Sequence, residues 1–198
     1  CRVGILDHKL TTEEMNLLYN SADGVVQISN AEGWGLSLTE AMLTGTPFIA
    51  TVTGGMQDQM RFEDKDGKWI EFNGEFPSNH HGTYKKHGEW ALPVYITSST
   101  LVGSPQTPYI FDDHHDVQDV ADQMMKLYKM SKKERKIIGK KGYDWALSEE
   151  AGFTSKIMSN RIIEGIEEVF STWKPREKFQ FLKDTDYEKR ILPHKLVY

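Results

Sequence analysis

Two short apolar runs, Val25–Ile28 and Phe48–Val52, constrain the fold of this chain more than any other feature. Both have the length of a strand and are rich in β-branched residues. A helix is predicted between them over about residues 37–44, and Gly45 is a plausible residue to end it. A strand, a helix and a second strand joined by short connections favour a parallel α/β sheet.

The same alternation is predicted upstream. Val3–Leu6 is an apolar run that indicates a buried strand, and a helix is expected to begin near Thr11. Thr11 and Glu14 have the spacing of a capping box, which supports that helix start. Because the chain opens on an expected core strand, we expect it to be part of something longer.

Residues 61–103 break this rhythm, because they are rich in Gly, His, Lys and acidic residues. Asn73-Gly74 is a strong signal for a two-residue hairpin. We therefore expect an insertion over 61–103 that carries a hairpin and long loops and rests on the parent sheet. A further short strand is predicted at Tyr109–Phe111.

The last third is predicted to be helical. An apolar stripe over Val117–Tyr128 repeats at helical spacing, and a capping box at Ser131 and Glu134 starts a second helix. A third helix is expected over about 154–171. The predicted fold class is thus α/β, a Rossmann-like parallel sheet flanked by helices, over residues 1–173. Residues 174–198 form a C-terminal extension.

Composition excludes several classes of protein. With 198 residues and 38% hydrophobic side chains the chain can build a globular core, and no apolar run is long enough to span a membrane. The net charge of -5 argues against a nucleic-acid binder. The single cysteine, Cys1, excludes an internal disulfide framework and fits a reducing compartment.

The segment Ala31–Pro47 holds the residues that suggest chemistry. It follows a predicted strand and opens a predicted helix, which is the edge where open α/β sheets bind ligands. Glycines let the backbone approach a ligand, and a helix N-terminus offers unpaired N–H groups to a diphosphate. Glu32 and Glu40 can accept hydrogen bonds from sugar or ribose hydroxyls. The alternative is structural, because Ser37 and Glu40 also fit a capping box and the glycines can serve the turn alone.

The whole stretch resembles the Glu-x7-Glu signature of the retaining glycosyltransferases of family 4, which have a GT-B fold of two Rossmann-like domains. The matching elements are Tyr19–Asp23, Glu32–Gly35, Glu40–Met42, Gly45–Pro47 and Gly54-Gly55. Trp34 replaces the more usual Phe, and the sequence after Gly55 departs from the commoner Gly-Gly-x-Pro-Glu.

This resemblance implies a role for each matching residue. Glu32 would contact hydroxyls of the transferred sugar as the catalytic carboxylate, and Glu40 would accept from the ribose. Leu10 would lie near the base. Backbone N–H groups would face the sugar and diphosphate, and two further glycines would line the site; these residues are Gly33, Trp34, Gly35, Leu36, Gly54 and Gly55.

The resemblance also implies an activity. The chain would supply donor contacts to an enzyme that transfers a sugar from a nucleotide-diphosphate sugar to an acceptor with retention, without a metal or another cofactor. The helix over 154–171 would cross back to an N-terminal acceptor domain that this chain does not contain, so the chain alone is not expected to catalyse transfer. The acceptor would be a glycan, lipid or protein, and the location cytoplasmic, with peripheral membrane association as an option. The alternatives are a non-catalytic sugar-nucleotide-binding module and a phosphorylase or synthase of the same fold.

Other polar clusters have simpler interpretations. His80-His81 and His114-His115 are adjacent pairs, whose side chains point to opposite faces of an extended chain and seldom chelate one metal. Asp112-Asp113 is read as acidic charge before a helix. Lys132-Lys133 and Lys140-Lys141 indicate a solvated helix face, with contact to anionic lipid as the alternative.

Overall fold

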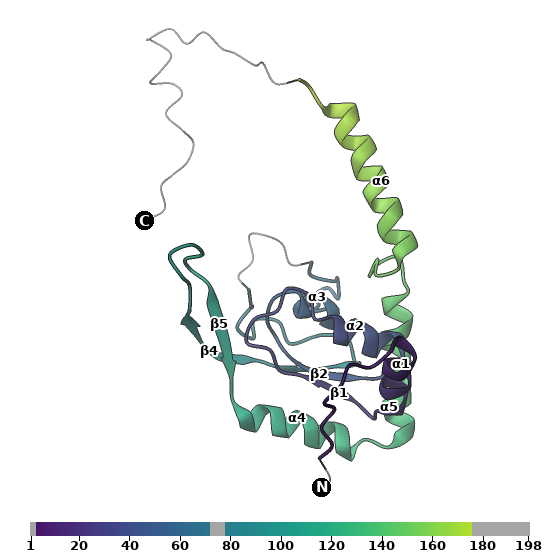
Figure 1. Cartoon of the computed structure of the whole chain (residues 1–198). Coiled ribbons are helices and arrows are strands. Elements are labelled where there is room, and N and C mark those ends of the chain that lie inside the picture. The colour runs from purple at the N-terminus through teal and green to yellow at the C-terminus, as the bar shows by residue number, and fades with distance from the viewer. Residues whose placement is uncertain (1–2, 72–77, 176–198) are drawn as a thin grey trace. The chain divides into compact units, whose positions relative to one another are not determined.

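The computed structural model describes residues 3–71 and 78–175 of the chain. A parallel sheet of order β1-β2-β3 lies at its centre, formed by Val25–Gln27, Phe48–Thr51 and Ala91–Val94 (Figure 1). The chain divides into two compact units, Cys1–Ile157 and Met158–Tyr198, and the sheet belongs to the first. The predicted α/β class with a parallel sheet is confirmed.

Strand β2 is the middle of the sheet, and all four of its residues are buried. Because side chains alternate along a strand, Phe48 and Ala50 face one core and Ile49 faces another. The first core contains side chains of α2 (Leu36–Leu43), α3 (Met56–Met60) and α5 (Lys132–Ala146). The second is closed by Val120 and Leu127 of α4 (Val117–Lys129). Helices therefore cover both faces, as parallel sheets require.

The predicted helix starts are confirmed. α1 (Thr12–Ser21) begins with a complete capping box between Thr11 and Glu14, and α5 begins with one between Ser131 and Glu134. α6 (Ser155–Thr172) corresponds to the helix expected over 154–171, and its role as a crossover helix stays a prediction.

Two strand predictions need correction. Val3–Leu6 forms no strand in the described structure, and Val3 and Ile5 are each 87% exposed. A strand needs a neighbour to take its hydrogen bonds, and this segment has none among residues 3–71 and 78–175. The strand expected at Tyr109 begins at Phe111, because Tyr109 has a left-handed φ of 64°.

The segment 61–103 contributes a strand that was not predicted. Its residues Ala91–Val94 form β3, which pairs with β2 as an edge strand of the parallel sheet. Pro93 obscured this strand, since proline fits a sheet only where its missing N–H is not needed, as at an edge. β4 (Ile96–Leu101) then pairs antiparallel with β5 (Phe111–His115). The hairpin predicted at Asn73-Gly74 lies outside the described residues, and the insertion itself stays a prediction.

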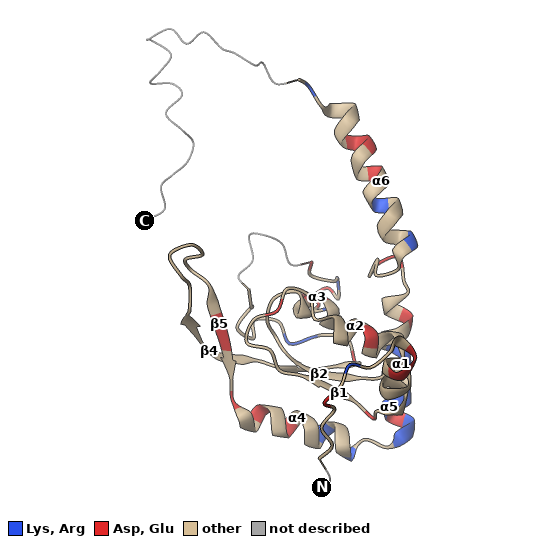
Figure 2. Ribbon diagram, viewed as in Figure 1, with Lys and Arg blue, Asp and Glu red and all other residues tan. Residues whose placement is uncertain are grey.

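Helices α2 and α5 pack closely at two glycines. A Cβ on Gly139 would lie 1.8 Å from the carbonyl oxygen of Gly45, so α5 tolerates no side chain there. Gly45 itself has a φ of +70°, which ends α2 as predicted. The exposed side of α5 carries a concentration of Lys and Arg (Figure 2).

We expect Gly139→Ala to lower the free energy of unfolding by about 3 kcal/mol, because the added methyl forces α5 away from the Gly45 backbone. Urea unfolding measures this change. Gly165→Ala in α6 is the control, since nothing lies within 4 Å of a Cβ there. Alanine should leave stability unchanged or raise it by up to about 1 kcal/mol at that helical position. Equal losses in the two variants would contradict the packing argument.

Candidate functional site

Two loops meet at the carboxyl edge of the sheet, and glycines allow their contact. One follows β1 and contains Glu32 and Gly33, and the other follows β2 and contains Gly54 and Gly55. A Cβ on Gly54 would lie 1.8 Å from the carbonyl oxygen of Glu32, and one on Gly55 would lie 2.3 Å from that of Gly33. The two glycines therefore position the first loop by close backbone contact, which a side chain would prevent.

Gln59 holds the rest of the first loop through hydrogen bonds to its backbone. This side chain of α3 is fully buried, and its amide Nε2 donates to the carbonyl oxygens of Trp34 and, at 3.2 Å, of Gly35. Its Oε1 accepts from the Thr39 hydroxyl at 2.8 Å, and that hydroxyl accepts from the Trp34 indole at 2.9 Å. The sequence analysis missed Gln59. No local pattern marked it, because Gln57 and Asp58 beside it in α3 are polar too.

These contacts determine which way the loop amides point. The carbonyl oxygens of Glu32 and Gly33 face the Gly54-Gly55 turn, and those of Trp34 and Gly35 face Gln59. In a trans peptide the N–H points opposite to the carbonyl. The N–H groups of Gly33, Trp34, Gly35 and Leu36 therefore point away from these carbonyl contacts. Successive outward N–H groups ahead of a helix make a concave site for an anion.

Glu32 is half-buried beside these amides and is oriented by Gln27 of β1. The Gln27 amide Nε2 donates to Glu32 Oε2 at 3.1 Å, and its Oε1 accepts from the Ser37 hydroxyl. The carboxylate is therefore fixed at the mouth of the loop.

Glu40 is held by α1 instead of capping its own helix. The Tyr19 hydroxyl donates to Glu40 Oε2 at 2.8 Å, while α2 begins after Gly35 with no side-chain cap. The capping-box interpretation of Ser37 and Glu40 is therefore wrong. Burial and the bond to Glu40 raise the pKa of Tyr19 to about 12, so the phenol stays a donor throughout the physiological range. Glu40 remains exposed and keeps acceptor capacity for a ligand.

The other predicted site residues surround this arrangement. Leu36 is 70% exposed at the first position of α2, and Leu10 is half-buried just ahead of α1. Their roles, like the other predicted site roles, stay predictions.

A buried carboxylate joins the loop after β2 to the β4–β5 pair. Asp113 of β5 is 1% exposed and accepts from the Thr53 hydroxyl at 2.6 Å, the Asn79 amide at 2.8 Å and the Ser99 hydroxyl at 2.6 Å. Its backbone N–H donates to the carbonyl oxygen of Asn30 in the loop after β1 at 2.7 Å. Asp113 therefore connects β5 to the loops after β1 and β2. The interpretation of Asp113 as acidic charge ahead of a helix is wrong. Asp116 fills the helix-capping role.

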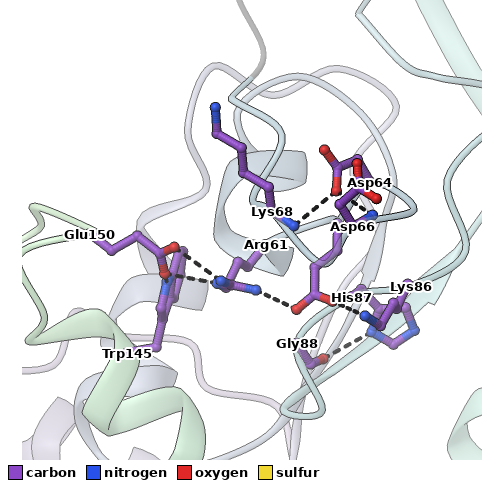
Figure 3. A network of polar contacts seen from close by, with 10 residues as sticks. Arg61, Asp64, Asp66, Lys68, Lys86, His87, Gly88, Trp145 and Glu150 are labelled. Atoms are coloured by element: carbon purple, nitrogen blue, oxygen red, sulfur yellow. Dashed lines mark hydrogen bonds and ion pairs between the residues drawn. The ribbon is translucent and has the colours of Figure 1, made fainter.

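Arg61, Glu150 and the Trp145 indole belong to a second polar network (Figure 3). Glu150 accepts from Arg61 at 2.8 and 3.0 Å and from the Trp145 indole at 2.8 Å, and the Arg61 hydrogen bond holds the pKa of Glu150 below its usual value. Trp145 packs edge-on against Phe153, with ring centroids 5.1 Å apart, and Phe153 packs in the same way against Trp34. The Trp34 loop is thus tied to the end of α5.

The histidine pairs do not form a metal site in the part of the chain that the structure describes. His80 is buried with its ring 4.4 Å from that of Phe62, whereas His81 is exposed. Within residues 3–71 and 78–175 no group of three or more potential ligands is arranged to hold a metal ion. None of the described helices is both long and apolar enough to cross a membrane.

Comparison with known proteins gives a family match and a similar structure. Residues 6–75 match the family model described as glycosyl transferases group 1. Sucrose-phosphate synthase from Thermosynechococcus elongatus has a similar structure, with a TM-score of 0.53 and 19% sequence identity over 83% of this chain. The chain spans 30% of the length of that protein. No curated protein sequence matched. The predicted resemblance and the predicted fold class are confirmed.

We expect Asp113→Ala to lower the free energy of unfolding by about 3 kcal/mol, because the buried donors of Thr53 and Asn79 and the Ser99 hydroxyl lose their acceptor. Chemical denaturation measures the loss. Asp112→Ala is the matched control, since Asp112 is half-buried on the same strand, and we expect a change within about 0.5 kcal/mol. A comparable loss in the control would show that Asp113 has no special role.

We expect stability to fall as the pH drops below about 6.5. Burial lowers the pKa of His80 from 6.5 to about 4, so the unfolded chain binds a proton more readily than the folded chain between these values. The loss should be on the order of 2 kcal/mol, after allowance for solvent screening, and should level off near pH 4.

Thermal melting across this pH range tests the effect. His80→Asn should flatten the profile, leaving a smaller slope from His87, whose pKa burial also lowers. His81→Asn should keep the profile of the parent chain, because His81 is exposed. An unchanged profile in His80→Asn would contradict the assignment.

Proposed function

We propose that this chain, which carries a group 1 glycosyl transferase domain over residues 6–75, supplies the donor-binding part of an enzyme that transfers a sugar from a nucleotide-diphosphate sugar with retention. The observation that supports this most is that four successive carbonyls of the loop after β1 are held by the Gly54-Gly55 turn and Gln59, which turns their N–H groups away from these contacts. The other parts of the donor would lie against residues around this loop.

The diphosphate of the donor fits the amide groups of Gly33–Leu36. Their N–H groups lead into the N-terminus of α2, whose dipole favours a negative ligand. Since the carbonyls are already held by glycine contacts and Gln59, the loop does not have to reorganise to meet developing charge. Preorganised donors of this kind stabilise a departing phosphate in the transition state.

The two glutamates divide the rest of the donor between them. Glu32 lies in the loop and accepts from hydroxyls of the transferred sugar, as the catalytic carboxylate. Glu40 accepts from the ribose hydroxyls, with Tyr19 holding its other oxygen. Leu10 contributes to the site for the base, and Gly54 and Gly55 line the donor site. The acceptor is a glycan, lipid or protein bound by other parts of the whole protein.

The nucleotide half of this proposal is tested with the 198-residue chain. We expect saturable binding of uridine or guanosine diphosphate by calorimetry, and Glu40→Gln should weaken it by about tenfold, because a charged acceptor for ribose is lost. Glu13→Gln, an exposed carboxylate at the start of α1, is the matched control and should bind as the parent does. Equal affinities in all three proteins would refute the role of Glu40.

The catalytic half needs the whole protein in which this chain occurs. Glu32→Gln should leave nucleoside diphosphate affinity within about twofold, since it touches the sugar and not the nucleotide, while transfer from the nucleotide sugar falls by about a hundredfold. Donor binding without sugar transfer or release in the parent protein would favour a non-catalytic module instead. Phosphate-dependent cleavage of an oligosaccharide would favour a phosphorylase of the same fold.

A further inference from the structure

One stretch of α5 concentrates positive charge on an acidic protein. Residues 132–141 contain six Lys or Arg and one Glu, a charge of +5, in a chain whose net charge is -5. The remaining residues together therefore carry -10. Figure 2 shows these basic residues gathered on α5. Such a separation of charge attracts anions to one place on the surface.

The basic side chains border a cleft. A cavity of about 790 Å³ lies between α5 and the C-terminal ends of α1 and α2, lined by Lys132, Arg135, Lys136 and Lys140 together with Asn16 and Asn20. It lies at the amino ends of β1 and β2, because Asp23 and Pro47 at its wall precede those strands. The loops of the proposed donor site follow the same strands, so the two sites are at opposite edges of the sheet.

The cleft keeps unpaired positive charge. Arg135 is held by Asp23 at 2.9 Å and by the carbonyl oxygen of Met130, and Lys140 is paired with Asp144. Lys132 and Lys136 have no ion pair with the described residues. Among the described residues, Asp23 is the one carboxylate on the cleft wall, and it is already bound by Arg135.

The spacing of the lysines suits a ligand with more than one anionic group. Lys132, Lys136 and Lys140 are four residues apart, so they lie along one side of α5 at intervals of about 6 Å. The Asn16 amide of α1 and the Tyr143 hydroxyl of α5 also line the wall and can donate to phosphate or sugar oxygens. The volume is that of a small-molecule site and is far larger than one inorganic ion needs.

We infer that this cleft is a second ligand site, which binds a small molecule carrying two or more phosphate groups through Lys132, Lys136 and Lys140. The inference goes beyond the proposed function and does not rest on it. The competing structural explanation is that the lysines only neutralise the C-terminal carbonyls of α1 and α2, neither of which has a basic residue in its last turn.

Calorimetric titration of the 198-residue chain with sodium tripolyphosphate tests the inference. We expect saturable binding. The variant Lys132→Gln/Lys136→Gln/Lys140→Gln should weaken it by about tenfold or more. Lys126→Gln/Lys129→Gln/Lys156→Gln removes the same charge elsewhere and should bind as the parent does. If the first variant does not fold, Lys132→Gln/Lys136→Gln replaces it and leaves the Lys140–Asp144 pair intact.

Several results would overturn the inference. They are the absence of saturable binding, equal weakening in the control variant, and unchanged affinity in the cleft variant, which would place the phosphate elsewhere on the chain. If the structural explanation holds, the parent chain does not bind tripolyphosphate, and the cleft variant is less stable than the parent.

Vesicles distinguish a soluble ligand from a lipid headgroup. The chain is mixed with vesicles of phosphatidylglycerol and phosphatidylcholine, and with phosphatidylcholine alone. Binding of tripolyphosphate without sedimentation on either vesicle supports the soluble ligand. Sedimentation on the anionic vesicles that depends on the same three lysines, without tripolyphosphate binding, would overturn the small-molecule site and identify the phosphate groups as lipid headgroups.

Discussion

The backbone contact between the Gly54-Gly55 turn and the loop after β1 is the constraint on which the rest of the site depends. Parallel strands β1 and β2 bring both loops to one edge of the sheet, but only glycines let the two backbones come within van der Waals distance. The carbonyls of Glu32 and Gly33 turn toward that contact, and their amide partners turn outward. The direction of these N–H groups is therefore a consequence of the backbone contact.

Buried polar side chains extend this constraint to distant parts of the chain. Gln59 holds two further carbonyls of the loop, and Asp113 joins the loop after β2 to β5. Both are almost fully excluded from water, where an unsatisfied polar group costs free energy. Because each of them has several partners, a shift of either loop would leave more than one group unsatisfied. This coupling makes the site rigid without any covalent link.

Sequence patterns predicted the elements well where a local signal existed. The capping boxes at Thr11 and Ser131 and the apolar runs of β1 and β2 depend on residues close together in the chain, and all were found as expected. β3 was missed because Pro93 weakens the strand signal, and only its neighbour β2 makes it a strand. Val3–Leu6 failed for the opposite reason, since an apolar run forms no strand without a partner.

The sequence by itself determined the α/β alternation, the glycine and glutamate spacing after β1, the capping boxes that start α1 and α5, and the glycine that ends α2, because these depend on period and on local hydrogen bonding. Only the tertiary structure decided that Glu40 bonds to Tyr19 and does not cap α2, and that Asp113 is a buried junction. It also brought the lysines of α5 to the ends of α1 and α2. The physical reason is that these contacts join residues far apart in the chain, whose distances are set by packing of the sheet and its helices and not by any local pattern.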